Sequence, residues 1–341
     1  MMKAVVWHGK DNFDFRCEQT EYPRIAPNQI IIKVQAAAIC GSDFHLSDFG
    51  AVPPLIAGHE VAGTVAETGK NVKALLVGDR VAMDPVQKCG HCYSCTHEIA
   101  NLCINYRHLG DDVTPGGWAE YMPVDAANAY KIPAGLSFSA ACLLEPAAVC
   151  CQSFERAKLR PGDNVLILGD GPFGFLHTMV ARGLGAGKII VAGHYDRRLE
   201  RIAKKTDAVV CNTHNENLQK VIASQLADNV GLDIAVEATG NAAAPNMAIK
   251  ALRPQGTLVV FSYIWKPQPL EMGMIHMKEL NVIGSCRSNC YEKCLALMAE
   301  GKIDTTHLVD MEVPLEQYRK AMDYLRNNKK DVFKAVLLPW Q

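Results

Sequence analysis

The stretch NVLILGDGPFGFLHTMVARGLGAGKIIVAG, from Asn164 to Gly193, carries the strongest signal of the fold. A short apolar run leads into a glycine turn, a helical segment follows, and a second apolar run ends at Gly193. The turn at residues 169–174 reads G-D-G-P-F-G and so fits G-x-G-x-x-G between a strand and a helix. In such a turn the first glycine permits the bend, the second lets backbone approach a pyrophosphate, and the third lets helix and strand pack closely. The stretch therefore predicts a βαβ unit that binds a dinucleotide.

Strands and helices continue to alternate after this stretch. The sequence predicts a helix near residues 197–206, a strand over 230–240, a helix near 245–252 and a strand over 256–263. This alternation indicates a doubly wound parallel sheet with helices on both faces, an α/β fold. Earlier in the chain, β-branched runs at 29–40, 59–69 and 79–85 predict a mostly-β region. Because 341 residues exceed the roughly 250–300 at which one core stops growing, we expect two domains.

The composition is that of an ordinary globular protein. Apolar residues make up 49% and the formal net charge is −1, which argues against a disordered or nucleic-acid-binding chain. No apolar run approaches the ~18 residues of a membrane helix, and the N-terminal segment lacks the apolar run of a secretory signal. We therefore expect a cytoplasmic protein that acts on a small molecule, with no nucleic-acid or membrane partner. Thirteen cysteines then favour reduced thiols, some of them metal ligands, over disulfides.

The residues after the second strand bear on the choice of dinucleotide. An acidic side chain there would bind the ribose 2′-hydroxyl and favour NAD, but this strand ends at Gly193. Without that carboxylate, Arg197 or Arg198 could pair with a 2′-phosphate, so the sequence favours NADP(H). NAD(H) remains the alternative if Asp196 turns back to the ribose. The expected cofactor-binding residues in this region are Gly169, Gly171, Pro172, Phe173, Gly174, Gly193, His194, Arg197, Arg198 and, further along, Thr239.

Four cysteines lie close together in KCGHCYSCTHEIANLC, with gaps of two, two and seven residues. Four thiolates make a closed tetrahedral zinc site, which is structural rather than catalytic. An iron–sulfur cluster is the alternative, but a ferredoxin-type run would have a gap of three and a following proline, where this sequence has Ile104. We therefore expect one structural zinc on Cys89, Cys92, Cys95 and Cys103, with the two nearby histidines exposed.

A second constellation is spread over ICGSDFH, GHE and LEP. Cys40, His59 and a carboxylate from one of these segments would make a mixed sulfur, nitrogen and oxygen set that leaves a coordination position for water or substrate, as catalytic zinc requires. The spacing alone leaves open whether these three pieces meet in one site.

The chain resembles the zinc-dependent medium-chain alcohol dehydrogenase superfamily. The matching pieces are CGSDFH, GHEVAGTVAETG, GDRVAMDP, the four-cysteine segment, GGWAEY, LEP and GDGPFG, in the family's order and over nearly the whole chain. The glutamate of LEP is typical of the sorbitol, polyol and threonine dehydrogenases, whereas liver-type enzymes have cysteine there. The resemblance implies a GroES-like, mostly-β catalytic domain over 1–147 and 288–341, with the structural zinc lobe at about 88–104. A Rossmann domain would then occupy 148–287.

The resemblance also implies a second, catalytic zinc, and so two zinc ions per chain. Its ligands would be Cys40, His59 and Glu60, with Glu145 as a fourth ligand or as the partner of a zinc-bound water, and one glutamate would leave when substrate binds. Ser42 and His45 would relay the proton, and Asp43 would orient the site. Arg287 would lie near the nicotinamide end of the coenzyme.

The expected reaction is zinc-assisted hydride transfer between NAD(P) and a secondary alcohol on a polyol, sugar or sugar acid. Three alternatives stay open: an amino alcohol of the threonine type, a zinc-free quinone reductase, and a non-catalytic zinc protein that senses the dinucleotide. The last two are disfavoured because the ligand set is present together. Relatives of this kind are homodimers or homotetramers, and we expect the same here.

Overall fold

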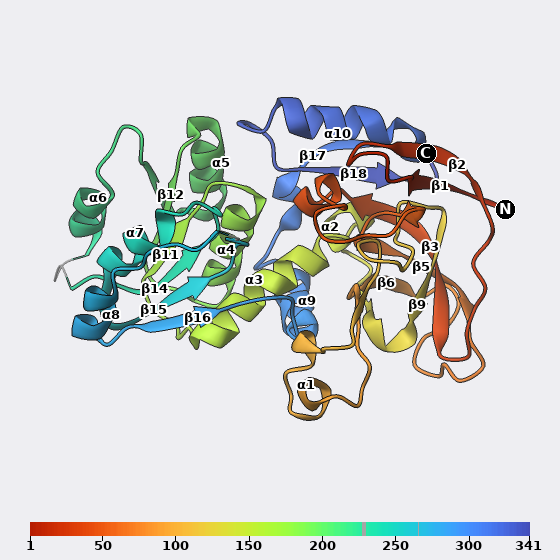
Figure 1. Cartoon of the computed structure of the whole chain (residues 1–341), viewed down its shortest axis with the longest axis horizontal. Helices are drawn as coiled ribbons and strands as arrows, with labels where there is room; N and C mark the ends of the chain where they lie inside the picture. The colour runs from red at the N-terminus through yellow and green to blue at the C-terminus, as the bar shows by residue number, and fades with distance from the viewer. Residues whose placement is uncertain (227–229, 265) are drawn as a thin grey trace.

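The computed structural model describes residues 1–226, 230–264 and 266–341. The chain forms two lobes, with α3 (Leu144–Ala157) and α9 (Tyr291–Ala299) between them (Figure 1). No helix in these residues is both long enough and apolar enough to cross a membrane.

One lobe is built on a six-stranded parallel sheet in the order β13-β12-β11-β14-β15-β16. The order reverses between β11 and β14, and such a switch point is where doubly wound folds bind ligands. The predicted α/β fold is confirmed. The strands are β11 (Val165–Leu168), β12 (Ile189–Gly193), β13 (Val209–Asn212), β14 (Leu232–Glu237), β15 (Leu252–Val260) and β16 (Asn281–Gly284). The helices are α4 (Pro172–Gly183), α5 (Asp196–Thr206), α6 (Leu218–Gln225), α7 (Ala244–Ala251) and α8 (Met272–Lys278).

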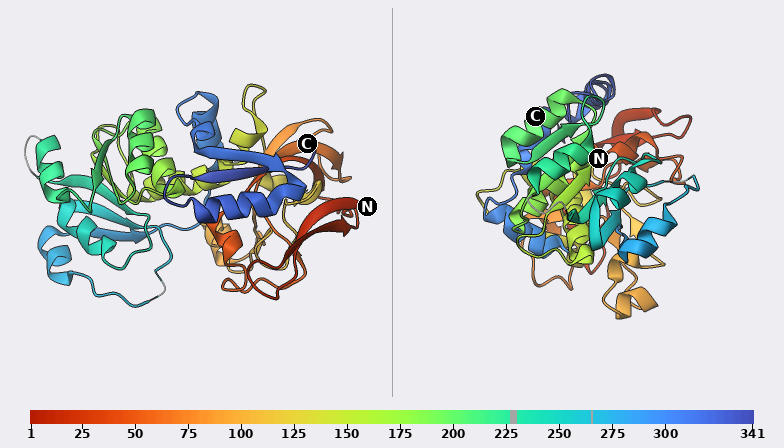
Figure 2. Two further views of the ribbon diagram at one scale, coloured as in Figure 1. Left: turned by 90° about the horizontal axis from the view of Figure 1, so that it is seen from above. Right: turned by 90° about the vertical axis from the view of Figure 1, so that its left-hand side faces the viewer.

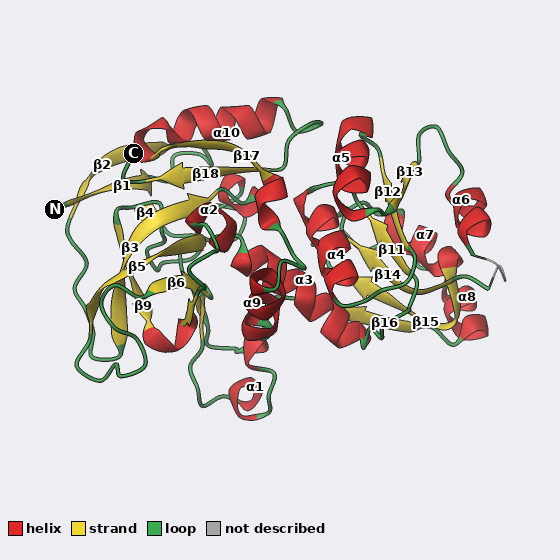
Figure 3. Ribbon diagram, turned by 180° about the vertical axis from the view of Figure 1, so that it is seen from behind, coloured by secondary structure: helices red, strands yellow, loops and turns green. Residues whose placement is uncertain are grey.

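Helices cover both faces of this sheet because successive strand residues point to opposite sides (Figure 3). Val165 and Ile167 of β11 belong to a buried cluster with α3, α4, α5 and α9. Leu166 and Leu168 belong to a second cluster with α6 and α7. A strand that is apolar at every position is thus explained by burial on both faces, as parallel sheets require.

The other lobe holds a larger sheet in the order β10-β6-β5-β3-β18-β17. Strand β9 pairs with the N-terminal part of β3, whereas β18 pairs with its C-terminal end. The last two strands of this sheet come from the C-terminal tail, which returns among the N-terminal strands (Figure 2). The strands of the lobe are β1 (Met2–Trp7), β2 (Phe15–Thr20), β3 (Gln29–Ala38), β4 (Leu55–Ile56), β5 (Glu60–Thr68), β6 (Arg80–Met83), β7 (Val86–Gln87), β8 (Arg107–His108), β9 (Tyr121–Asp125), β10 (Ala129–Lys131), β17 (Val309–Pro314) and β18 (Lys334–Leu338). The helices are α1 (Tyr93–Thr96), α2 (Phe138–Ala141), α10 (Tyr318–Asn327) and the 3₁₀ segments η1 (Gly41–Phe44), η2 (Ala100–Leu102), η3 (Ala126–Asn128), η4 (Thr305–Leu308) and η5 (Leu315–Gln317).

Helix α3 joins the two lobes. It begins before the predicted boundary at 147/148 and ends after it, and it contacts β5 and β6 of one lobe and α4 and β15 of the other. The division of the chain at 147/148 and 287/288 therefore remains a prediction about where one folding unit ends.

Candidate metal centres and dinucleotide site

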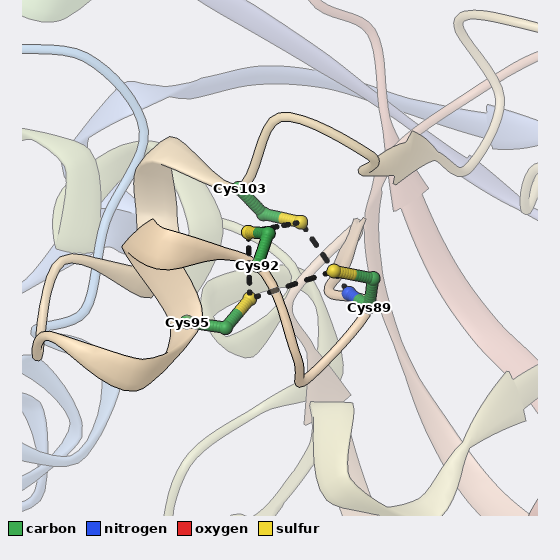
Figure 4. A group of neighbouring side chains, drawn as sticks. All are labelled: Cys89, Cys92, Cys95 and Cys103. Carbon is green, nitrogen blue, oxygen red and sulfur yellow. Dashed lines mark hydrogen bonds between the residues drawn. The ribbon is translucent and has the colours of Figure 1, made fainter.

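The four predicted cysteines converge in a lobe around the short helix α1 (Figure 4). The sulfur of Cys92 lies 3.6 Å from that of Cys95 and 3.8 Å from that of Cys103, and Cys89 lies 4.0 Å from Cys95. These separations far exceed a disulfide bond of ~2.05 Å. They match the edges of about 3.8 Å of a sulfur tetrahedron with ~2.3 Å metal bonds.

The surroundings of the cysteines also suit a structural metal. A hydrogen bond from the backbone of His91 is the largest factor that lowers the pKa of the Cys89 thiol to about 6, whereas burial raises the pKa of the Cys95 thiol to about 12, so Cys95 would lose its proton to the bound metal. His91 and His97 are exposed, and the ring of His97 stacks on Tyr93 instead of pointing at the sulfurs. The residues present fit a closed zinc site made of four thiolates.

Cys40, His59 and Glu60 form a second group of possible metal ligands. One donor atom from each lies within 4.8 Å of the others, and all three residues are buried. Cys40 follows β3, and His59 immediately precedes β5, which pairs with β3. The antiparallel register brings Ala38 opposite Glu60, so two segments 20 residues apart meet.

Two buried atoms of this group have no hydrogen-bond partner among the described residues: Nδ1 of His59 and Oε2 of Glu60. Unpaired buried polar atoms are costly, so their presence is a sign of an additional ligand. A divalent cation would satisfy the free oxygen of Glu60 and the sulfur of Cys40. The donor set of one thiol, one imidazole and one carboxylate fits a catalytic zinc that keeps an open position.

Lys334 neutralises part of the negative charge of this group. Its Nζ lies 2.5 Å from Oε1 of Glu60 and 3.3 Å from the carbonyl oxygen of Ile39, and both charged side chains are buried. Burial alone would lower the pKa of Lys334, but Glu60 and then Cys40 raise it above its ordinary value. Only one oxygen of Glu60 therefore remains for a metal.

Glu145 lies beside the group without belonging to the tight set of ligand atoms. It stands in the first turn of α3. Burial raises the pKa of its carboxyl to about 8, while His59 lowers it and Glu60 raises it further. This places Glu145 close enough to the other two to interact electrostatically, so its roles as fourth ligand or as partner of a bound water both remain predictions.

Asp43 supports the group from η1. Its Oδ2 accepts a hydrogen bond of 2.7 Å from the backbone N–H of Cys40, and its Oδ1 lies 3.7 Å from Nδ1 of His59. Burial raises the pKa of the carboxyl to about 7, against the lowering effect of His59. These contacts support the predicted orienting role.

The predicted proton relay runs towards the surface. Ser42 is half-buried in η1, and His45, at its end, is 61% exposed, with Nδ1 3.0 Å from Oδ2 of Asp48. His45 thus has the solvent contact that the last member of a relay needs. A link between the two side chains stays a prediction.

The glycine turn has the shape that its sequence predicted. Gly169 has a φ of +125°, and a Cβ atom on Gly174 would lie 1.9 Å from the carbonyl oxygen of Gly169. A Cβ atom on Gly171 would meet only Nη1 of Arg198, at 3.8 Å. Gly169 therefore allows the backbone to turn, Gly174 allows α4 to pack against that turn, and Gly171 leaves space for a ligand. Pro172 and Phe173 begin α4, which points its N-terminus at that space.

Comparisons with known proteins agree with this geometry. The family model described as alcohol dehydrogenase GroES-like domain matches residues 26–134, and the one described as zinc-binding dehydrogenase matches residues 172–300. A sorbitol dehydrogenase of Bacillus subtilis (strain 168) is 33% identical over 346 residues, which cover 99% of this chain and 97% of that protein. The chain belongs to the zinc-dependent medium-chain alcohol dehydrogenase superfamily. The resemblance drawn from the sequence motifs is thereby confirmed, including its branch of polyol and threonine dehydrogenases.

Solved structures place the fold of this dehydrogenase equally well. An alcohol dehydrogenase from Escherichia coli CFT073, complexed with NADH, has a TM-score of 0.91 at 27% identity and covers 99% of both chains. A zinc-binding dehydrogenase from Sinorhizobium meliloti 1021, bound to NADP, has a TM-score of 0.90 at 28% identity with the same coverage. These two relatives bind different coenzymes, so the fold alone does not select one.

Two further predicted cofactor residues, Thr239 and Arg287, make contacts within the chain. Thr239 follows β14, and its N–H and its hydroxyl each donate a 2.7 Å hydrogen bond to Oε1 of the buried Glu237. Arg287 has a φ of +55°, and its guanidinium lies 3.4 Å from the ring centroid of Tyr106, in the segment that follows the cysteines. It thus bridges the two lobes of the dehydrogenase.

Sequence reasoning missed two residues of the dehydrogenase site, Lys334 and His108. The ring of His108 packs edge-on against that of His59, 5.3 Å away, and burial followed by His59 lowers its pKa well below the ordinary value. His108 carried no recognisable spacing. A lysine inside the apolar strand FKAVLLP was a usable signal, because a buried cation requires a buried partner.

Proposed function

We propose that this dehydrogenase interconverts a secondary alcohol and the corresponding ketone on a polyol, sugar or sugar acid. The observation that carries the proposal is the buried group of Cys40, His59 and Glu60, in which Oε2 of Glu60 has no hydrogen-bond partner among the described residues, in a protein with a G-x-G-x-x-G dinucleotide turn. The rings of Phe49 and Tyr263, one from each lobe, lie 5.6 Å apart and connect the metal lobe to the dinucleotide lobe.

Oxidation of an alcohol carbon removes a hydride and a proton. When bound, zinc acidifies the substrate hydroxyl and the nicotinamide ring accepts the hydride. In this proposal Cys40, His59 and Glu60 would hold the metal, and Glu145 would be a fourth ligand or the partner of a metal-bound water. One of the two glutamates would leave when substrate binds, and Asp43 orients His59. Ser42 takes the hydroxyl proton towards His45, which is exposed and passes it to water.

A second zinc on the four cysteines has a structural role in this proposal. Cys40→Ser should abolish turnover, lower the zinc content from two to one per chain, and leave the fold intact. Cys92→Ser should lower the zinc content equally but chiefly reduce the midpoint of thermal unfolding. Metal analysis, circular dichroism and initial rates on the two variants separate these roles. Equal loss of folding in both variants would contradict the assignment.

The substrate class rests on resemblance to the sorbitol dehydrogenase and on the glutamate at position 145. The test is a panel of polyols, sugars, sugar acids and L-threonine, each with NAD⁺ and with NADP⁺, read as nicotinamide absorbance. Turnover of L-threonine alone would favour the amino-alcohol alternative. Protein that binds zinc and coenzyme but oxidises nothing on the panel would favour the dinucleotide-sensing alternative.

Three further expectations belong to the same proposal. The coenzyme is NAD(H) or NADP(H): the sequence favoured NADP(H) through Gly193, Arg197 and Arg198, but both arginines contact the C-terminal segment in the structure and so lend that choice no support. A homodimer or homotetramer is expected by resemblance, and light scattering measures it. A cytoplasmic location is expected from composition, and cell fractionation tests it.

A further inference from the structure

The side chain of Asp170 lies where the adenosine ribose is recognised in a Rossmann fold. Asp170 is part of the glycine turn after β11, but its side chain leans against the end of β12. A Cβ atom on Gly193 would lie 2.5 Å from Cβ and from Oδ2 of Asp170. The residue at the end of this strand normally reads the ribose 2′ position. Asp170 therefore fills, from the neighbouring strand, the space that an acidic side chain at position 193 would occupy.

The carboxylate of Asp170 also accepts hydrogen bonds from the backbone groups between β12 and α5. Its Oδ2 accepts the backbone N–H groups of His194 and Tyr195, each at 2.7 Å, and Tyr195 is the residue before α5. Its Oδ1 lies 4.0 Å from Nη1 of Arg198. Backbone N–H groups at a helix start, together with an arginine, are the groups that proteins use to bind a phosphate. Here an internal anion already holds them.

The two arginines expected to bind a 2′-phosphate already have partners within the chain. Nη2 of Arg198 donates a 2.7 Å hydrogen bond to the carbonyl oxygen of Val332, and its guanidinium packs on the ring of Phe333. Nη1 of Arg197 pairs with Asp331 at 3.3 Å. Each positive charge at this corner is therefore matched by a carboxylate of the chain itself.

We propose that Asp170 determines the coenzyme of this dehydrogenase and selects NAD(H) against NADP(H). Its carboxylate occupies the place of the 2′-phosphate, repels that phosphate, and leaves Oδ1 to accept the 2′-hydroxyl of the NAD ribose. Specificity built from an unfavourable contact with the wrong ligand needs no added contact with the right one. The absence of an acid at position 193, which by itself favours NADP(H), is thus compensated from position 170. The proposal rests on the proposed function, in which this turn binds a nicotinamide dinucleotide.

The test is a titration of the zinc-loaded protein with NADH and with NADPH, without substrate, followed by calorimetry or by the fluorescence of the bound coenzyme. We expect the wild type to bind NADH roughly 100-fold more tightly than NADPH. Asp170→Asn keeps an oxygen for the two N–H groups but removes the charge, so that ratio should fall at least about tenfold, mainly through tighter NADPH binding. Asp170→Ser, which is smaller, should shift the ratio in the same direction.

Asp196→Asn is the matched control, because it removes a carboxylate from the first turn of the same helix. Asp196 accepts a hydrogen bond from Asn212, and its replacement should leave the coenzyme ratio unchanged. A wild type that binds both coenzymes equally, or an Asp170 variant with an unchanged ratio, overturns the proposal. A ratio that changes in Asp196→Asn alone overturns it in favour of Asp196. A folded wild type that binds neither coenzyme refutes the proposed function itself.

Discussion

The contact between Gly174 and the turn beneath it allows a test of the dinucleotide-binding unit. A Cβ atom at this position would lie 1.9 Å from the carbonyl oxygen of Gly169 and 2.7 Å from its carbonyl carbon, both backbone atoms. Ordinary contact begins at 3.4 Å. Gly174→Ala must therefore move the start of α4 away from the turn by roughly 1.5 Å, a change that overpacking data put at about 1–3 kcal/mol.

The same movement displaces the backbone N–H groups at the start of α4, which would face the pyrophosphate. We expect Gly174→Ala to lower the stability by that 1–3 kcal/mol and to weaken NADH binding at least about tenfold, which is ~1.4 kcal/mol. Urea unfolding gives the first quantity, and a titration of coenzyme fluorescence gives the second.

Gly183, the last residue of the same helix, provides the control. A Cβ atom on Gly183 meets its nearest neighbours, in Ile303 and Lys302, at 3.5 Å, which is ordinary contact. Gly183→Ala should raise the stability by about 0.5–1 kcal/mol, since alanine loses less entropy in a helix, and should leave coenzyme binding unchanged. If Gly174→Ala behaves like Gly183→Ala in both assays, the third glycine is not needed for α4 to pack against the turn, and the reasoning is refuted.

Two more predictions concern buried charges. Lys334→Met leaves Glu60 buried without its cation and should lower the free energy of unfolding in urea by about 3–5 kcal/mol. The double variant Lys334→Met with Glu60→Gln should recover part of that loss. A loss below about 1 kcal/mol in the single variant would contradict a buried ion pair. His177 is fully buried, and burial lowers its pKa from 6.5 to about 4. Below pH 6.5 the unfolded chain binds a proton that the folded chain refuses, so stability should fall by up to about 1.4 kcal/mol per pH unit towards pH 4. His177→Gln should flatten this slope, and an unchanged slope would mean that His177 is protonated in the folded protein.

The parts of the fold that follow from local pattern were predictable. The strand, turn and helix at residues 164–193 appear as β11, α4 and β12, because each segment's apolar pattern matches its burial. The strand expected over 256–263 begins earlier, at Leu252, because that residue pairs with Leu232 across the sheet. Such pairing between distant segments is invisible in the spacing of the residues themselves.

The residues of the site also divide into those that local sequence pattern predicts and those that depend on contacts between distant segments. The four cysteines lie within one short segment and could be grouped from sequence, whereas the approach of Cys40 to His59 could only be expected from family resemblance. Lys334 and Asp170 were missed because their partners, Glu60 and the end of β12, come close only through the folded sheets. A rule that examined position 193 alone could not see a carboxylate supplied from position 170.

The route of the chain through the larger sheet affects the order in which parts of the protein can fold during synthesis. Strand β18 pairs with β3, and Lys334 at its start neutralises Glu60 on β5. During synthesis, all six strands of the parallel sheet have been made once residue 284 has left the ribosome, while the other large sheet still lacks β17 and β18. A nascent chain that stops before residue 334 exposes an open sheet edge and carries an acid without its counterion. Such an intermediate is the kind of species that chaperones retain.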